Sequence, residues 1–152
     1  MTGKIDSVFV AGPFWALVDK ETGTIAGTAR DHLEDVLRHY DDMGVKIYNA
    51  HRREAWGSAF LEPAEFTKLD YDEISASDVV VAFPGVPASP GTHIEIGWAS
   101  AMDKPLVLLL EKDVEYAGLI EGLPSFRRCE LVRFAGAVDL DELDAAVARA
   151  IR

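Results

Sequence analysis

The sequence predicts an α/β fold: a single-domain, doubly wound, mostly parallel five-stranded sheet with helices on both faces. Three observations predict it. Short apolar runs rich in β-branched residues alternate along the chain with segments of helical periodicity, which is the order typical of parallel sheets. One run near the middle, DVVVAFPG, is almost continuously apolar, as expected of a central strand covered on both faces. The chain has 152 residues, 49% of them hydrophobic, which is enough for one sizeable core.

The first two strands flank a loop and a helix. Residues 7–12, SVFVAG, are β-branched and aromatic and end at Gly-Pro, which predicts a short buried strand. Residues 13–28 are rich in turn formers and predict a loop. Between residues 30 and 43 the apolar residues recur at helical spacing, and Gly44 ends the run. Residues 45–50, VKIYNA, predict the second strand.

The central part of the chain contains two helices around the clearest strand. Residues 51–63 are polar and predict a loop or a short helix. Residues 63–77 predict a helix with a proline at its first position, where proline is favoured. The apolar run at residues 78–85 follows as the third strand, and a helix is expected from about Thr92 to Met102.

The last third repeats the alternation. Residues 104–112 predict a fourth strand, 114–122 a short helix and 129–134 a fifth strand. Residues 139–152 form an amphipathic pattern that Asp139 is suited to cap. No internal repeat or linker interrupts residues 1–152, so we expect one domain of the flavodoxin-like or Rossmann-like type, joined by right-handed crossovers.

Composition restricts the partners and the compartment. The formal net charge of −11 argues against binding a nucleic-acid polymer, although a single nucleotide needs only backbone N–H groups at a helix start. No apolar run reaches membrane-spanning length and the first residues lack a signal-peptide pattern, so we expect a cytoplasmic protein without a membrane partner. The one cysteine, Cys129, excludes an internal disulfide, and we expect it to be a small buried hydrophobe.

In a doubly wound sheet, ligands bind beyond the carboxyl ends of the strands, where the strand order reverses. The loop GVPASPGT precedes a predicted helix and supplies Ser89, Gly91 and Thr92. Backbone N–H groups and two hydroxyls there are suited to hold a phosphate, although the loop lacks the Gly-Lys-Ser/Thr ending of a Walker motif. The alternative is an ordinary proline-rich connection between a strand and a helix.

Two other loops reach the same edge. Gly12, Phe14 and Trp15 follow the first strand and offer a stacking wall, unless the aromatic rings only fill the core. His51 and Arg52 follow the second strand and are candidates for substrate contacts, unless they belong to a surface salt-bridge cluster. The four histidines show no metal-ligand spacing, so we expect no metal and no cofactor.

Carboxylates near this edge are candidates for catalysis. We expect the helix dipole to keep Glu95 ionised near the helix start, where it is available as a nucleophile; the alternative is a glutamate that only complements the dipole. Asp70 and Asp72 lie on the preceding helix, and residues two apart point about 200° apart, so only one of them faces the site. The alternative for both is a solvated helix face.

Together, four stretches resemble the nucleoside 2-deoxyribosyltransferase superfamily: VFVAGPF, YNAHRREAWG, LDYDEISASDVVVAFPGVPASPGTHIEIGWA and KPLVLLLE. The resemblance covers nearly the whole chain and is strongest to the nucleotide N-glycosidase branch, which includes CMP and hydroxymethyl-CMP hydrolases of nucleoside-antibiotic biosynthesis, the mildiomycin and blasticidin type. It implies a nucleophilic role for Glu95, a catalytic role for Asp70 and a 5′-phosphate site at Ser89 and Gly91. Residues 12–15 would line the base pocket.

The resemblance also implies a homodimer or larger assembly. In the branch that hydrolyses deoxynucleotides, a serine from a neighbouring subunit reaches the phosphate, and Ala117 stands at the corresponding place here. Tyr116, beside it, is a candidate substitute.

The function that the resemblance implies is hydrolysis of the N-glycosidic bond of a pyrimidine ribonucleoside 5′-monophosphate, CMP or 5-hydroxymethyl-CMP. The products would be the free base and ribose 5-phosphate, formed through a glycosyl ester on Glu95. Two alternatives remain open: transfer of deoxyribose between bases, and a nucleotide sensor without catalysis.

Overall fold

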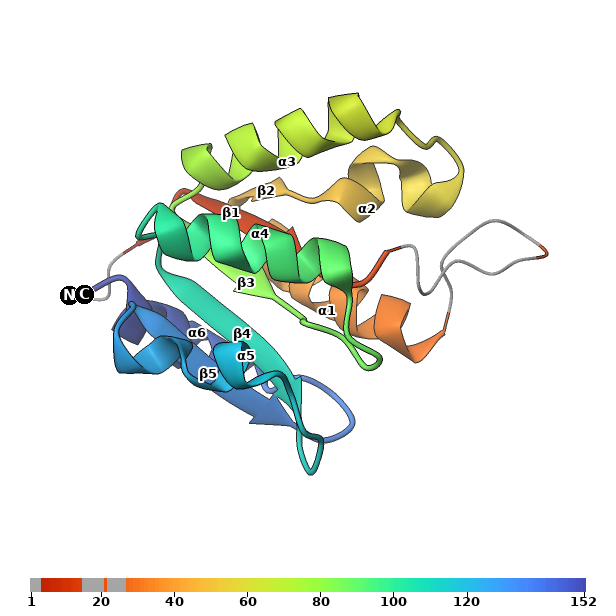
Figure 1. Cartoon of the computed structure of the whole chain (residues 1–152). Helices are drawn as coiled ribbons and strands as arrows, with labels where there is room; N and C mark the ends of the chain where they lie inside the picture. The colour runs from red at the N-terminus through yellow and green to blue at the C-terminus, as the bar shows by residue number, and fades with distance from the viewer. Residues whose placement is uncertain (1–3, 15–20, 22–26) are drawn as a thin grey trace.

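The computed structural model describes residues 4–14, 21 and 27–152. Within them a single sheet has the strand order β2-β1-β3-β4-β5, and every neighbouring pair is parallel (Figure 1). The predicted α/β fold is therefore confirmed, with a sheet that is wholly rather than mostly parallel. The strands are β1 (Ser7–Ala11), β2 (Lys46–Tyr48), β3 (Val79–Ala82), β4 (Leu106–Glu111) and β5 (Cys129–Phe134).

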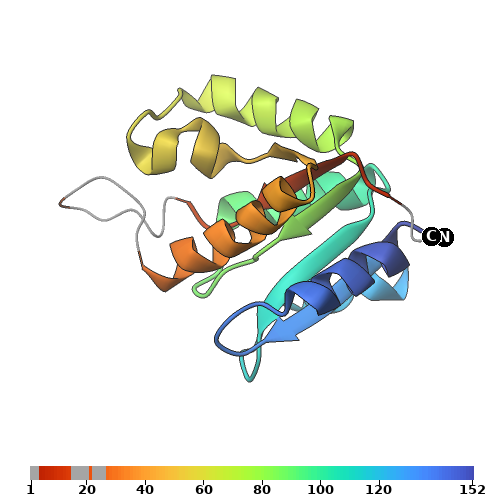
Figure 2. The same cartoon turned by 180° about the vertical axis from the view of Figure 1, so that it is seen from behind.

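The helices form two layers. In Figure 1, α4 (Pro90–Ala101) and the short α5 (Gly118–Glu121) lie in front of the sheet, and α3 (Pro63–Ala76) lies beside α4. Figure 2 shows α1 (Thr28–Asp42) and α6 (Leu140–Ala150) against the opposite face. Both faces of the sheet are covered, which explains why its strands are continuously apolar.

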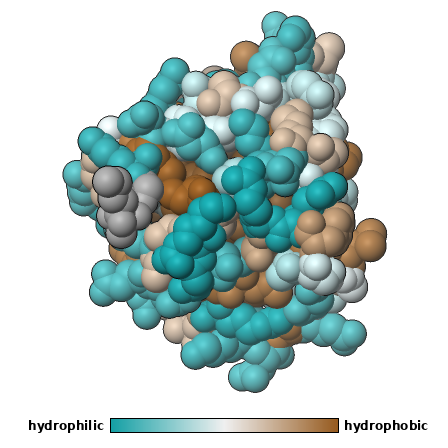
Figure 3. All heavy atoms as spheres, turned by 90° about the vertical axis from the view of Figure 1, so that its left-hand side faces the viewer, coloured by the Kyte–Doolittle hydropathy of each residue, from teal (hydrophilic) through white to brown (hydrophobic). Residues whose placement is uncertain are grey.

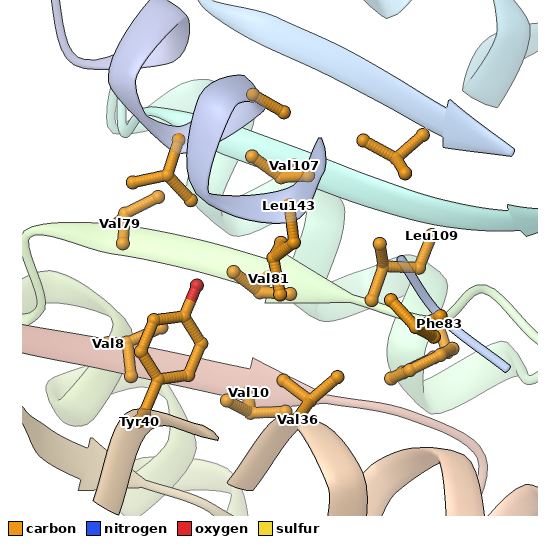
Figure 4. Packing of buried hydrophobic residues seen from close by; sticks show 14 of the residues in the cluster. Val8, Val10, Val36, Tyr40, Val79, Val81, Phe83, Val107, Leu109 and Leu143 are labelled. Carbon is orange, nitrogen blue, oxygen red and sulfur yellow. The ribbon is translucent and has the colours of Figure 1, made fainter. Parts of the chain in front are cut away.

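Alternate side chains of each strand enter one of two cores. Figure 4 shows the core beneath α1 and α6, where ten labelled side chains interlock. Strands β1, β3, β4 and β5 contribute buried side chains to it, and Tyr40 of α1 and Leu143 of α6 pack against them. The labelled residues are Val8, Val10, Val36, Tyr40, Val79, Val81, Phe83, Val107, Leu109 and Leu143.

The second core lies beneath α3, α4 and α5. Phe9, Val80 and Leu108 from the strands pack there with Ile74 and Ile96 from the helices. Because Ile74 and Ile96 anchor the two helices on the sheet, they determine which sides of α3 and α4 face the carboxyl ends of the strands. Cys129 is also buried in this core, as expected, and burial raises the pKa of its thiol to about 12.

Several boundaries differ from those predicted. The second strand is shorter, because Asn49 leaves the sheet and caps a short helix, α2 (Ala50–Arg53). The helix expected from Thr92 begins two residues earlier, at Pro90, because Ser89 is its N-cap. The short helix expected over residues 114–122 covers only Gly118–Glu121.

The two ends of the sheet differ. The C-terminus lies near the amino ends of the strands, and hydrophilic residues cover most of that face (Figure 3). At the carboxyl ends, β1 and β3 lie side by side at the centre of the sheet, where the strand order reverses. Among the described residues, no helix combines the length and apolar character needed to cross a bilayer.

Candidate functional site

A cavity of about 360 Å³ lies at the carboxyl end of β1, beside the start of α4. This is the point of reversal in the strand order, where such sheets bind ligands. The end of β1, the short helix α2, and the facing sides of α3 and α4 surround it. The lining residues are Val10, Ala11, Gly12, Phe14, Ala50, His51, Glu54, Phe66, Thr67, Asp70, Ser89, Pro90, Gly91, Thr92, Ile94, Glu95 and Trp98.

The start of α4 is arranged around Ser89. Its hydroxyl oxygen accepts hydrogen bonds from the Thr92 backbone N–H (3.3 Å) and from the Thr92 hydroxyl (3.0 Å), and both side chains are buried. Pro90 has no N–H to satisfy. The Gly91 N–H makes no hydrogen bond within the described part of the chain, and a Cβ at Gly91 would meet no protein atom within 4 Å. The helix start therefore presents an N–H group at an open position, as an anion site requires.

Glu95 and Asp70 share the same cavity and are hydrogen-bonded to each other. Burial raises the pKa of Glu95 well above its usual range, and the charge of Asp70 raises it further. Burial also raises the pKa of Asp70, although the Arg53 guanidinium opposes that rise. Two carboxyl groups in contact cannot both ionise easily, so the pair favours a state with one shared proton, and the larger rise in pKa places that proton mainly on Glu95.

The expected direction of the effect on Glu95 was therefore wrong, because its pKa is raised rather than lowered by its surroundings. Because α4 begins at Pro90, Glu95 is the sixth residue of the helix and not part of its first turn. The dipole effect fades within the first turn, whereas desolvation and the neighbouring carboxylate act directly on Glu95.

The structure separates Asp70 from Asp72. Asp70 faces the cavity and accepts a hydrogen bond from Arg53 Nη2 at 2.7 Å. Asp72 is exposed and pairs with Lys68 along the outer side of α3, at 2.6 Å. Arg53 also donates through Nη1 to Glu73, at 2.9 Å, so that one guanidinium bridges two carboxylates of α3.

His51 supports the wall of the cavity. It is buried, and burial lowers the pKa of its imidazole to about 4, so the ring is neutral at pH 7. Nε2 lies 2.8 Å from the Pro13 carbonyl oxygen and Nδ1 lies 3.1 Å from the Asn49 amide nitrogen. These partners assign the proton to Nε2, which donates, while Nδ1 accepts. Phe14 stacks on the imidazole with ring centroids 4.8 Å apart.

One of the predicted binding residues, Arg52, is not brought to this cavity. Arg52 is exposed and forms a two-pronged ion pair with Asp41, at 3.1 and 2.7 Å, and it does not line the cavity. Its neighbour Arg53 makes the contact with the site instead, since successive residues of a helix point about 100° apart. Trp15 lies outside the described residues. The other predicted residues, Gly12, Phe14, His51, Ser89, Gly91 and Thr92, line the cavity together with Glu95 and Asp70.

Sequence reasoning missed part of the apolar wall. Phe66 of α3 and Ile94 and Trp98 of α4 line the cavity. Trp98 follows Ile94 by four residues and Glu95 by three, a spacing that places all three on one side of a helix. That spacing was a usable signal. Nothing in the sequence pointed to Phe66, which depends on how α3 packs against α4.

The hydroxyl of Tyr116 accepts a hydrogen bond from the Glu111 backbone N–H, at 2.7 Å. Its contact with the phosphate of a neighbouring subunit stays a prediction. In the described ranges, no group of three or more His, Cys, Asp or Glu side chains is placed to hold a metal ion. Arg53 occupies the centre of the acidic cluster instead.

Comparison with known proteins gives three informative structures. BlsM, whose solution structure is known, is 45% identical over 97% of this chain and 90% of its own, with a TM-score of 0.77. A CMP N-glycosidase from Clostridium botulinum, BcmB, is 36% identical over 83% of this chain and 88% of its own, with a TM-score of 0.59. No family model and no curated protein sequence matches the chain.

The third structure shares the fold. A 2-deoxyribosyltransferase from Bacillus psychrosaccharolyticus is 17% identical over 91% of this chain and 90% of its own, with a TM-score of 0.59. Three features indicate the same family: the parallel sheet, the cavity where its strand order reverses, and the sequence identity to the first two proteins. The chain belongs to the nucleoside 2-deoxyribosyltransferase superfamily.

Proposed function

We propose that this protein is a nucleoside 5′-monophosphate N-glycosidase that hydrolyses CMP or 5-hydroxymethyl-CMP to the free base and ribose 5-phosphate. The observation that carries the proposal is the pairing of Glu95 with Asp70 in one cavity with the open start of α4. A nucleotide needs both features, because its phosphate and its anomeric carbon are held at the same time. The identity of 36% to a CMP N-glycosidase supports the same substrate class.

In the proposed mechanism the 5′-phosphate binds at the Gly91 N–H and the Ser89 and Thr92 hydroxyls. The shared proton then passes from Glu95 to Asp70, which leaves Glu95 as a carboxylate. An oxygen of Glu95 attacks C1′, the bond from C1′ to the base nitrogen breaks, and the departing base takes its electron pair and the proton from Asp70. The products of this half-reaction are the free base, a glycosyl ester and an ionised Asp70.

The second half-reaction uses the same two groups. Asp70 removes a proton from water as the water oxygen attacks C1′, and the ester bond to Glu95 breaks with its electrons returning to the carboxylate. Ribose 5-phosphate leaves, and the pair again holds one proton. Protons and electrons therefore balance over the cycle without a cofactor.

The apolar wall is suited to the base. Phe14 and Trp98 line the cavity, and a pyrimidine ring stacks well on aromatic faces. Phe14 is held in place by its stacking on the neutral His51 ring, so it presents a fixed surface rather than a mobile side chain.

The test is a product assay with CMP, hydroxymethyl-CMP, dCMP and UMP, followed by separation of the free bases. We expect the wild type to release cytosine from CMP and the Glu95→Gln variant to release none above background. Glu142→Gln, a matched change at an exposed position of α6 on the other face of the sheet, should keep wild-type activity. Absence of base release by the wild type across the panel, or unchanged release by Glu95→Gln, would reject the proposal.

The same assay separates the alternatives. If a second free base is added and new nucleotide or nucleoside forms faster than hydrolysis, the protein is a transferase. If CMP binds tightly and remains intact after a long incubation, the protein is a sensor.

We also propose that the protein forms a homodimer. Ile94 and Tyr71 are exposed on α4 and α3, at 55% and 46%, and Ile94 also lines the cavity. A second copy placed over this face would cover these side chains and close the site. Light scattering coupled to size exclusion should give twice the mass of one chain, and Ile94→Glu should give a monomer. A monomeric wild type at micromolar concentration would contradict this proposal.

A further inference from the structure

The segment Asn49–Glu54 contributes one guanidinium to the site, and the structure shows how firmly that group is held. The Asn49 amide donates to the Val10 carbonyl oxygen of β1 at 2.9 Å, and its side-chain oxygen caps α2 by accepting from the Arg52 N–H at 2.9 Å. The Arg53 N–H donates to the Asn49 carbonyl oxygen at 3.1 Å. The backbone of Arg53 is therefore attached to the strand that ends at the cavity.

Glu54, the residue after Arg53, fixes the end of α2. Glu54 is 3% exposed and accepts a hydrogen bond from the Leu61 backbone N–H at 3.1 Å. This contact ties the end of α2 to the chain that enters α3. The Arg53 side chain consequently leaves a fixed backbone and reaches α3 at a defined place.

The guanidinium ends as a fork between two carboxylates. Nη2 lies 2.7 Å from Asp70 and Nη1 lies 2.9 Å from Glu73, and the Arg53 side chain is only 20% exposed. Two parallel contacts of this kind restrain the plane of the guanidinium and the carboxylates it binds. Asp70 is thus held on one side by Arg53 while it shares a hydrogen bond with Glu95 on the other.

The charges around the fork are mostly negative. Among the described residues, four carboxyl groups lie around one guanidinium, a lysine of β2 acts on Glu73 through its charge, and the buried histidine of α2 is neutral. These groups are Glu54 at the C-cap of α2, Asp70 and Glu73 of α3, Glu95 of α4, Lys46 of β2 and His51 of α2.

We propose that Arg53 is a positioning residue of this site, which orients Asp70 toward Glu95 through its forked contact and determines which of the two carboxyl groups carries their shared proton. The inference rests on the proposed function for its meaning in catalysis. With the guanidinium beside it, Asp70 is the better place for a negative charge, and the proton stays on Glu95 until substrate binds. Without the guanidinium this preference weakens and Asp70 is free to rotate.

The sign of the effect on pH dependence follows from the charge. Arg53 lowers the pKa of both Asp70 and Glu95, so loss of its charge raises both. The active form holds one proton in the pair, and it appears as pH rises through the lower of the two pKa values. Removing the charge should therefore move the acid limb of the kcat/KM profile to higher pH, by about one unit for a partly exposed group.

The experiment compares Arg53→Gln and Arg53→Lys with Arg133→Gln, which removes an exposed ion pair of β5 in which Nη2 alone contacts both carboxylate oxygens of Glu121. We expect Arg53→Gln to lower kcat by roughly 10- to 100-fold and to shift the acid limb upward. Arg53→Lys keeps the charge but cannot bridge both carboxylates. It should therefore show a lowered kcat, with the acid limb of its kcat/KM profile at the same pH as in the wild type. Arg133→Gln should change neither quantity.

A second measurement does not depend on turnover. Carbon-13 NMR titration of the carboxyl groups, assigned with Glu95→Gln and Asp70→Asn, should show both midpoints of the pair moving upward in Arg53→Gln. Circular dichroism establishes that each variant is folded at the pH values used. If wild type is inactive on every nucleotide, the proposed function fails while this titration still tests Arg53. Unmoved midpoints in folded Arg53→Gln, or full kcat in Arg53→Lys, would overturn the inference.

Discussion

The substitution Gly91→Ala tests the phosphate site with a single methyl group. Gly91 is the second residue of α4, is exposed and lines the cavity. A Cβ there meets no protein atom within 4 Å, so the methyl group enters only space that a ligand would use. Alanine is also a better helix former than glycine, and the variant should gain up to about 0.5–1 kcal/mol in free energy of unfolding.

In contrast to stability, which should rise, binding of CMP should weaken. If the 5′-phosphate accepts a hydrogen bond from the Gly91 N–H, the methyl group keeps the phosphate from approaching it. Loss of one charge-assisted hydrogen bond costs about 1.5–3 kcal/mol, which corresponds to roughly a 10- to 150-fold loss of kcat/KM for CMP. Activity on cytidine, which has no phosphate, should change far less. A stabilised protein with impaired CMP turnover would separate a ligand effect from a folding effect.

The matched control lies on the same helix. Gly97 is exposed, does not line the cavity, and a Cβ there also meets no protein atom within 4 Å. Gly97→Ala should raise stability in urea unfolding and leave kcat/KM for CMP unchanged. Wild-type kcat/KM for CMP in Gly91→Ala, or equal losses for CMP and cytidine, would refute the assignment of the phosphate to this helix start.

Three further predictions follow from the described contacts. Asp70→Asn should lower kcat by about 10²- to 10⁴-fold in the CMP assay, whereas Asp72→Asn, at an exposed ion pair, should stay within about twofold; equal losses would contradict the geometry. His51 has a folded-state pKa of about 4 against 6.5 unfolded, so unfolding takes up a proton between these values and its contribution to stability falls as pH falls. The unfolding free energy of wild type minus that of His51→Gln, measured in urea, should drop by about 3 kcal/mol from pH 7 to pH 4, and a flat difference would contradict a buried neutral ring. Arg52→Gln should change the free energy of unfolding by at most about 1 kcal/mol and kcat/KM by less than threefold, because the ion pair of Arg52 with Asp41 is exposed. A large rise in KM would instead support Arg52 as a substrate-binding residue.

The sequence by itself determined the fold class and the general place of the site. Apolar runs and helical periodicity depend on local spacing, so each strand of the sheet and each long helix was predicted within a few residues. The alternation then fixed a parallel sheet, and parallel sheets carry their ligand sites at the carboxyl ends of the strands. That rule points to Gly12, Ser89 and Gly91, because each follows a strand or stands at the start of a helix, and Glu95 lies one turn further along α4.

Only the tertiary structure decided which side chains meet. Asp70 rather than Asp72, and Arg53 rather than Arg52, face the cavity because the packing of Ile74 and the cap at Asn49 set the rotation of two helices. The raised pKa of Glu95 was decided in the same way, by burial and by the carboxylate of Asp70, 25 positions earlier in the chain (95 − 70). Local spacing records neither desolvation nor contacts between distant residues, and both require the assembled layers.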